Sequence, residues 1–264
     1  MTTRSRFLAL ALALSALAAN AEFAVAISPP RFELEAKAGD VVRQTMEITN
    51  GALQSAALSI KTADWTYEPD GGVNFRDDLA PGSCRPWVTI ERRELTVVAG
   101  KPYRFRFEIL PPAGTPPTEC RFAILVEGQQ ESTNAGGLVV PFNARLAVIV
   151  YLGVGGVQPE LAVVGTEVQT VDGKPTPVLR VRNTGLAHGR LEGVRAGTAA
   201  RNTPLDFVAR GYPILPGETR AVPLNASRQG DADAPVSLAF PVTVKGRLEW
   251  GKKQSQDFEQ RFVQ

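Results

Sequence analysis

The chain has 264 residues, and its 29 Lys and Arg against 27 Asp and Glu give a formal net charge of +2. A charge this close to zero, without a local basic cluster, argues against a protein that binds nucleic acid through a basic surface. The hydrophobic fraction is 44%, and the 20 Pro and 24 Gly fall between short apolar runs. This pattern predicts many strands joined by turns rather than long helices.

The first residues have the pattern of a secretory leader. Arg4 and Arg6 precede an apolar stretch over 7–18. Ala21 and Ala26 each end a small-x-small triplet, so we expect cleavage after one of them and assign 1–26 to a signal peptide. A membrane anchor is the alternative, but the stretch is too short to cross about 30 Å of hydrocarbon. No later stretch is long enough to span a membrane, so we expect no membrane insertion of the mature protein.

The candidate strands of the first half are short and lie between turn signals rich in Gly, Asn, Asp or Pro. These candidate strands are 31–35, 42–49, 57–62, 87–90, 103–109, 121–126 and 138–152. Strands at this spacing, with turns between them, predict a Greek-key β-sandwich.

The two cysteines, Cys84 and Cys120, both fall in this first half, 36 positions apart. An even cysteine number in an exported chain favours a disulfide bond. Two cysteines are too few for a zinc site, and the chain has no C-x-x-C motif for redox chemistry. We therefore predict a disulfide bond between Cys84 and Cys120, with two free buried thiols as the alternative.

The segment Gly153-Val154-Gly155-Gly156, followed by Pro159, breaks the strand pattern and predicts a domain boundary. A second series of candidate strands follows it, at 160–164, 178–182, 190–196, 220–224, 236–244 and 257–262. No segment shows a helical period, so we predict an all-β chain of two immunoglobulin-like sandwich domains, 27–153 and 158–264.

The two halves also resemble each other in their turns. A strand ends in Asn50-Gly51 in the first half and in Asn183-Thr184-Gly185 in the second. A second pair of similar turn-plus-strand segments lies at 97–103 and 214–220. Two copies of one sandwich plan are the simplest explanation of this similarity.

Residues that could support catalysis are scarce. The single histidine, His188, lies in a Gly-rich turn, where we expect an ordinary polar turn residue. The acidic pairs at 77–78 and 231–233 could bind calcium weakly, but solvated turns are the simpler interpretation. The chain has no Gly-x-Ser-x-Gly elbow and no G-x-G-x-x-G motif. We therefore predict no catalytic site, no metal site and no cofactor.

The run 138–152 is unusually long for a strand. The period of two places Leu138, Val140, Phe142 and Ala144 on one face of it. One interpretation is a strand that faces the core of its own domain. The other is an edge strand that offers its apolar face to another protein.

The order of several motifs resembles that of the PapD-like periplasmic chaperones of the chaperone–usher pilus pathway. These motifs are Ile27-Ser28-Pro29-Pro30-Arg31, Met46-Glu47-Ile48-Thr49-Asn50, Trp65 ahead of Asp70-Gly71-Gly72, Pro86-Trp87-Val88-Thr89-Ile90, Tyr103-Arg104-Phe105-Arg106 and Glu119-Cys120-Arg121-Phe122. The run 138–152 falls where the family has its donor strand. The resemblance is strong over 27–155 and loose over 158–264.

The resemblance implies two sandwiches in an L-shaped or boomerang arrangement and a function in fimbrium biogenesis within the periplasm. The chaperone would lend the face of Leu138, Val140, Phe142 and Ala144 to a pilus subunit that lacks a strand, and would deliver that subunit to an outer-membrane usher. Pro141 departs from this pattern, because it removes one backbone donor from the lent strand.

The resemblance also implies that Arg31 anchors the terminal carboxylate of the subunit. The alternative for Arg31 is a surface pair with Glu33 or Glu35. A second basic residue of the family would fall near Ala147, and Arg145, two positions earlier on the same face, is our substitute for it. The alternative for the whole chain is a noncatalytic secreted protein with a structural or adhesive role.

Overall fold

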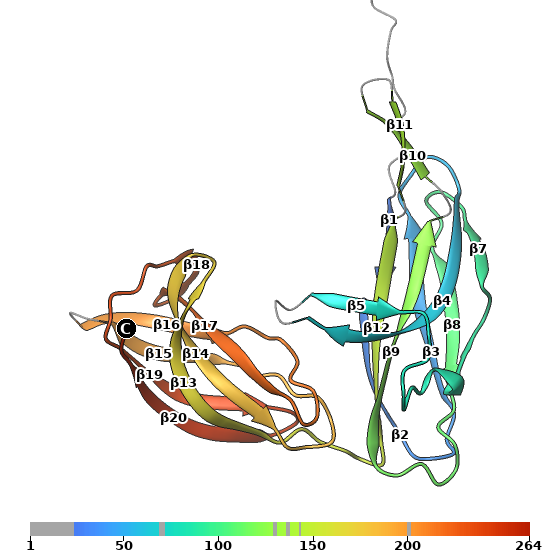
Figure 1. Ribbon diagram of the computed structural model, residues 1–264. Coiled ribbons are helices and arrows are strands. Elements are labelled where there is room, and N and C mark those ends of the chain that lie inside the picture. The colour runs from blue at the N-terminus through green and yellow to red at the C-terminus, as the bar shows by residue number, and fades with distance from the viewer. Residues whose placement is uncertain (1–23, 69–71, 129–130, 136–137, 143, 200–201) are drawn as a thin grey trace, which may run out of the picture.

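The structure is a computed structural model that describes residues 24–264 apart from 69–71, 129–130, 136–137, 143 and 200–201. The described residues form strands, connecting loops and one short 3-10 turn, η1 (Arg85–Trp87). Figure 1 shows two β lobes that meet at one end and diverge at a wide angle, which confirms the predicted L-shaped, all-β architecture. Among the described residues, no helix could cross a membrane.

The N-terminal lobe packs two sheets face to face. The first sheet has the strand order β1 (Val25–Ser28), β3 (Val42–Asn50), β8 (Tyr103–Ile109) and β6 (Val88–Ile90). The second has the order β2 (Arg31–Ala36), β12 (Arg145–Val154), β9 (Thr118–Gly128), β4 (Ala56–Tyr67) and β5 (Val73–Arg76), and β7 (Glu94–Val97) also pairs with β4.

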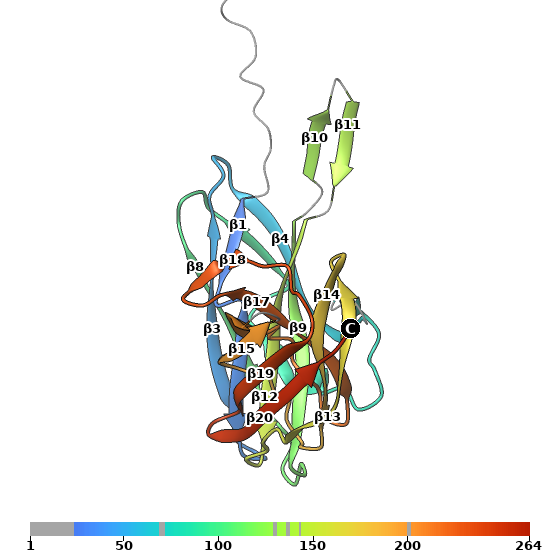
Figure 2. The same ribbon diagram turned by 90° about the vertical axis from the view of Figure 1, so that its left-hand side faces the viewer.

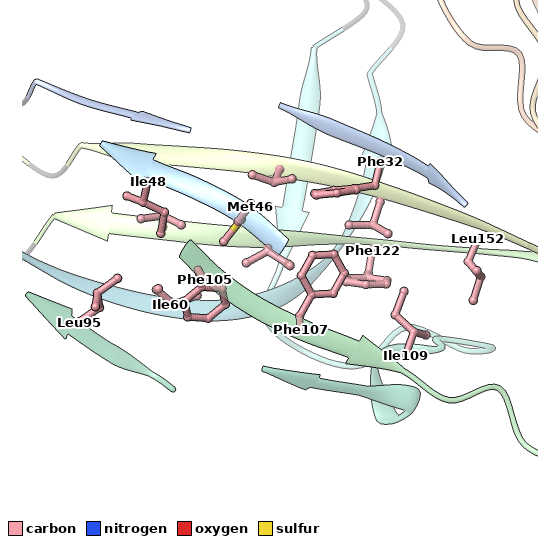
Figure 3. Packing of buried hydrophobic residues seen from close by; sticks show 14 of the residues in the cluster. Phe32, Met46, Ile48, Ile60, Leu95, Phe105, Phe107, Ile109, Phe122 and Leu152 are labelled. Carbon is pink, nitrogen blue, oxygen red and sulfur yellow. The ribbon is translucent and has the colours of Figure 1, made fainter. Parts of the chain in front are cut away.

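The core between these sheets comes from the alternation of apolar and polar residues along each strand. On β8, Phe105 and Phe107 are fully buried, whereas the alternate residues Arg104 and Arg106 are exposed. The rings of Phe32 and Phe107 meet edge to face, with their centroids 5.2 Å apart, at the centre of the cluster in Figure 3. The period of two in the sequence therefore fixes which face of each strand is buried.

The predicted disulfide bond between Cys84 and Cys120 is present. Its Cα atoms are 5.8 Å apart, and both residues are buried in the core of this lobe. Cys84 immediately precedes η1, and Cys120 lies on β9. The bond therefore ties a connecting loop to a central strand.

The predicted long strand over 138–152 is wrong, because this segment forms two strands. β11 (Leu138–Phe142) pairs with β10 (Glu131–Ala135) in a separate two-stranded ribbon, which projects beyond the sandwich in Figure 2. β12 begins at Arg145 and pairs with β9 in the sheet. The division has a physical cause: β9 ends at Gly128, which is opposite Ala144, so β11 has no neighbour in this sheet and pairs with β10 instead.

The C-terminal lobe is built on a single sheet with a separate core. Its strand order is β13 (Leu161–Val171), β14 (Lys174–Asn183), β17 (Thr219–Arg228), β16 (Thr203–Ala209), β15 (Val194–Ala199), β19 (Val242–Trp250) and β20 (Gln254–Phe262), with β18 (Asp231–Pro235) paired to β17. Contacts between β13 and β20 bring the two ends of the sheet together. The predicted strand over 236–244 is wrong in its first part, because β19 begins only at Val242.

The matching Asn turns of the two halves have the same construction. Asn50 and Asn183 are buried, and each side-chain amide donates hydrogen bonds to two backbone carbonyls. Each side-chain oxygen accepts a bond from the backbone N–H two positions later, on Ala52 and on Gly185. The similarity seen in the sequence therefore reflects one turn built twice.

Candidate functional site

The candidate site lies on the outer face of the six-stranded sheet, the face turned away from the core of the N-terminal lobe. On β12, Val148, Val150 and Leu152 point into the core. The alternate residues Ala147, Ile149 and Tyr151 pack on the outer face with residues of β4 and β9. Leu215 of the C-terminal lobe also packs against this group. The outer face is therefore where the two lobes meet.

A change of sheet brings Arg31 to this face. β1 pairs with β3 in one sheet, and β2 pairs with β12 in the other. Pro29 and Pro30 lie between the two strands, and Pro30 has no backbone N–H to offer to either ladder. Arg31 is therefore the first residue of β2, and it lies opposite Ile149 in the parallel ladder with β12.

Arg31 is half exposed, and its partner is Glu33. Its Nε lies 2.9 Å from Glu33 Oε1, with the two side chains 50% and 47% exposed. This is the surface pair that the sequence left as the alternative for Arg31. Its role as a carboxylate anchor stays a prediction.

Arg145 is on the same face but is also paired. Its Nε lies 2.6 Å from Glu127 Oε1, and Lys61 approaches the same oxygen at 3.4 Å. Arg145 precedes Ile149, the neighbour of Arg31, by four residues, which corresponds to about 13 Å along a strand. The two predicted anchor residues therefore share a face but do not contact each other.

The four residues of the predicted donor face are divided between described and undescribed parts of the chain. Leu138, Val140 and Phe142 lie on β11, opposite Ala135, Thr133 and Glu131 of β10, and their side chains lie outside the described residues. Ala144 precedes β12, and its carbonyl accepts a hydrogen bond of 3.0 Å from the Gly128 N–H. Their role as a lent surface stays a prediction.

His188 is not the ordinary polar turn residue that the sequence indicates. Its side chain, from the C-terminal lobe, is only 9% exposed. Its Nδ1 lies 2.6 Å from Glu119 Oε2 on β9, and its backbone N–H donates to the same oxygen at 2.8 Å. Its ring stacks on Tyr151, with the centroids 3.7 Å apart. His188 therefore links the two lobes.

The second ring nitrogen of His188 faces both a cation and an anion. Nε2 lies 2.9 Å from Arg190 Nη1 and 3.5 Å from Glu33 Oε1. Burial acts to lower the pKa of His188, but hydrogen bonds to Glu119 and Glu33 outweigh burial and raise it above its ordinary value. In the neutral ring Nε2 can accept a bond from Arg190, whereas in the protonated ring it can only donate, toward Glu33.

Glu33 joins this group to Arg31. The hydrogen bond from His188 is the main reason that the pKa of Glu33 falls to about 2; burial opposes the shift, and the charges of Arg190, His188 and Arg31 add to it. Arg190 Nη1 donates to Glu33 Oε1 at 2.7 Å. At neutral pH Glu33 is therefore a carboxylate shared between the predicted anchor and the other lobe.

Aromatic and ionic contacts add to this junction. Arg220 of the C-terminal lobe lies over the ring of Tyr67, 4.8 Å from its centroid. The Tyr67 hydroxyl lies 3.3 Å from that of Tyr151. Burial, and then the hydrogen bond with Tyr67, raise the pKa of Tyr151. Lys252 forms an ion pair with Glu35, so β2 contacts the C-terminal lobe at a further point.

A cavity of about 310 Å³ lies at the junction, lined by residues of both lobes that include Glu33, Glu119, His188 and Lys252. Three of its acidic groups, Glu33, Glu35 and Glu119, have basic partners in Arg190, His188 and Lys252, as described above. Over the described parts of the chain, no group of three or more His, Cys, Asp or Glu is placed to hold a metal ion. The arrangement supports electrostatic fixing of the two lobes to each other.

The chain matches no family model and no curated protein. Among solved structures it is similar to a chain from a chaperone–tip adhesin complex of CFA/I fimbriae biogenesis, at 12% identity and a TM-score of 0.50, over 90% of this chain and 98% of that one. It is also similar to the class 5 fimbriae chaperone CfaA, at 13% identity and a TM-score of 0.48, over 91% and 99%. A third is a Salmonella enterica SafA pilin–SafB chaperone complex, at 13% identity and a TM-score of 0.46, over 91% and 97%.

The match to the first of these structures covers nearly all of both chains, so the likeness includes both lobes and their connection. At 12% identity it establishes the fold and not the activity. The predicted resemblance is thus confirmed at the level of the fold, and the chain has the fold of the PapD-like fimbrial chaperones.

Proposed function

We propose that this protein is a periplasmic chaperone of fimbrial assembly that binds pilus subunits by donor-strand complementation. One arrangement carries the proposal. The β10–β11 ribbon projects beyond the sandwich (Figure 2), and β11 is followed closely by β12, which lies directly beside Arg31. A projecting strand, and a basic group that pairs with the chain seven residues further along, can together hold an extended segment that ends in a carboxylate.

The proposed chemistry is strand addition. A subunit that lacks one strand exposes unpaired backbone groups and an apolar groove, both of which promote aggregation. β11 supplies the missing strand, with Leu138, Val140 and Phe142 filling the groove, and main-chain hydrogen bonds provide affinity. Delivery of the capped subunit to an outer-membrane usher completes the proposed function.

Arg31 is the proposed anchor for the subunit's terminal carboxylate. A guanidinium can bind a carboxylate through two parallel hydrogen bonds, which fixes the position of the segment end as well as its charge. Arg145 is the proposed second basic residue, further along the same face. Both arginines are paired, but Glu127, the partner of Arg145, is 22% exposed, whereas Glu33, the partner of Arg31, is 47% exposed. The better shielded pair is harder to exchange, so we expect Arg145 to contribute less than Arg31.

Export belongs to the same proposal, with residues 1–21 as the leader and 27–153 and 158–264 as the two domains. Cleavage after Ala26 would remove Val25 and Ala26, which pair with Asn50 and Thr49 in the first sheet. Cleavage after Ala21 leaves β1 intact and is the site we propose. The disulfide bond of Cys84 supports export, because such bonds persist in oxidising compartments.

Co-purification tests the proposal. The tagged protein is isolated from the periplasm of its own cells, and bound proteins are identified by mass spectrometry. We expect small fimbrial subunits on the wild-type protein and none on Phe142→Asp. Val164→Asp, at an exposed apolar position of the C-terminal lobe, is the matched control and should retain them. Recovery at the cell surface without subunits would instead support a structural or adhesive protein.

Phe142→Asp also separates a lent surface from an ordinary core. If this substitution unfolds the isolated protein, measured by circular dichroism, then Phe142 belongs to the protein's own core. Strand donation by β11 would then be wrong. A folded variant that still binds subunits would contradict the proposal equally.

A further inference from the structure

Glu33 is a carboxylate that already occupies the predicted anchor. Glu33 Oε1 lies 2.9 Å from Arg31 Nε, so the two side chains form a close ion pair. Both residues stand on the outer face of β2, separated by the buried Phe32. A ligand carboxylate that binds Arg31 therefore competes with Glu33 for the same guanidinium.

Glu33 has a second set of partners in the other lobe, and these are better buried. Arg190 Nη1 lies 2.7 Å from Glu33 Oε1, and the Arg190 side chain is 15% exposed, against 50% for Arg31. His188 Nε2 lies 3.5 Å from the same oxygen, with its side chain 9% exposed. An ion pair that is shielded from water is stronger than one at the surface, so the C-terminal lobe holds Glu33 more firmly than Arg31 does.

We propose that Glu33 is an internal competitor that occupies Arg31 in the free protein and gives it up to a ligand carboxylate, while Arg190 and His188 retain Glu33. This inference rests on the proposed function, since it concerns the same anchor. The exchange keeps every charge paired: Arg31 passes from one carboxylate to another, and Glu33 keeps its partners in the C-terminal lobe. The junction between the lobes thereby sets the affinity of the anchor.

The size of the effect follows from exposure. An exposed ion pair changes an equilibrium by about fivefold at most. We therefore expect Glu33→Gln to strengthen carboxylate binding at Arg31 by about two- to fivefold. Arg190→Ala should weaken it by about twofold, because Glu33 then relies on Arg31 alone among the arginines. In the double variant the effect of Arg190 should disappear, because both changes act through the same carboxylate.

The test uses acetate as the probe and the full mature protein. The arginine Nε–Hε signals are followed by ¹⁵N NMR while acetate replaces chloride at constant ionic strength, and the Arg31 signal is assigned by its loss in Arg31→Lys. Glu35→Gln is the matched control: Glu35 lies on the same face of β2, but its partner is Lys252. It should leave the acetate affinity of Arg31 unchanged.

The acetate affinities of the variants distinguish the possible outcomes. A two- to fivefold gain for Glu33→Gln with no gain for Glu35→Gln supports the inference. No gain for Glu33→Gln, an equal gain for both variants, or no response of Arg31 to acetate in any variant overturns it. If Glu33→Gln alters the whole spectrum, Glu33→Asp provides the comparison. The shorter Asp side chain should reach Arg31 less well, so the acetate affinity of Arg31 should again increase.

The two proposals fail in different ways. If acetate exchange at Arg31 follows Glu33 but no fimbrial subunit co-purifies, the competitor is supported and the chaperone function is wrong. If subunits co-purify but Arg31 does not respond to Glu33→Gln, the chaperone function stands and the competitor is wrong.

Discussion

Replacement of His188 by Ala should loosen the junction of the two lobes. This side chain is the shared partner of Glu119 on β9 and Tyr151 on β12, and it lies almost entirely out of solvent. Its removal leaves the buried Glu119 carboxylate without the imidazole. The His188 backbone N–H still donates to Glu119 Oε2 at 2.8 Å in this variant, but the other Glu119 oxygen has no hydrogen-bond partner among the described groups, so no second side chain replaces the imidazole.

The magnitude follows from two contacts. A hydrogen bond to a charged group contributes about 1.5–3 kcal/mol. Stacking of His188 on Tyr151 adds about 0.5–1.5 kcal/mol, by analogy with aromatic pairs. We therefore expect His188→Ala to cost about 2–4.5 kcal/mol. His188→Phe keeps a ring on Tyr151 but makes no side-chain hydrogen bond to Glu119. It should therefore lose only the hydrogen-bond contribution of about 1.5–3 kcal/mol.

Urea unfolding gives the free energy, and small-angle X-ray scattering gives the arrangement of the lobes. We expect a lower unfolding midpoint and a larger radius of gyration for His188→Ala, with smaller changes for His188→Phe. A free energy of unfolding within about 0.5 kcal/mol of wild type, together with an unchanged scattering curve, would refute this account of the junction.

Four further predictions concern the same contacts and the frame that supports them. Asn183→Ala should lower the free energy of unfolding by about 2–4 kcal/mol in urea titrations, because it leaves buried backbone groups unpaired. Replacing both Cys84 and Cys120 by Ala should cost about 3–4 kcal/mol, and reduction should have the same effect on wild type but none on the variant. The stabilisation by Glu33, whose folded pKa is about 2, is present above its ordinary value of 4.5 and is lost as pH falls toward 2. The raised pKa of His188 acts at the other end, so its stabilisation is present below about 6.5 and is lost as pH rises through the folded pKa, and His188→Phe should remove this dependence.

Local features of the fold could be predicted from the sequence. The alternation along 103–109 matches β8, because one face of that strand is buried and the other is solvated. The disulfide bond followed from the cysteine count and the expected export. The break of 138–152 into β11 and β12 could not be predicted, since it depends on where the partner strand β9 ends. Short strands such as β5 and β7 carry too few residues to show a period.

The candidate site was predictable only in part. The family resemblance predicts Arg31 as an anchor. The sequence also allows its ion pair with Glu33, because the two residues are neighbours on one face of the strand. The contact of His188 with Glu119 spans 69 positions and crosses two lobes. No local pattern reports such a contact, so a lone histidine in a Gly-rich turn gave no sign of it.

Strand β2 explains why the anchor and the junction belong together. Its outward residues are Arg31, Glu33 and Glu35. Arg31 pairs with Glu33, Glu33 also pairs with Arg190 of the C-terminal lobe, and Glu35 pairs with Lys252. Phe32 between them points into the core and fixes the register, because a slip of one residue would bury Glu33 in its place. Under the proposal that Arg31 is the anchor, movement of the C-terminal lobe changes the partners of Glu33, and through Glu33 it changes how freely Arg31 can receive a ligand carboxylate. Binding at the anchor and the angle between the lobes are then linked by a single carboxylate.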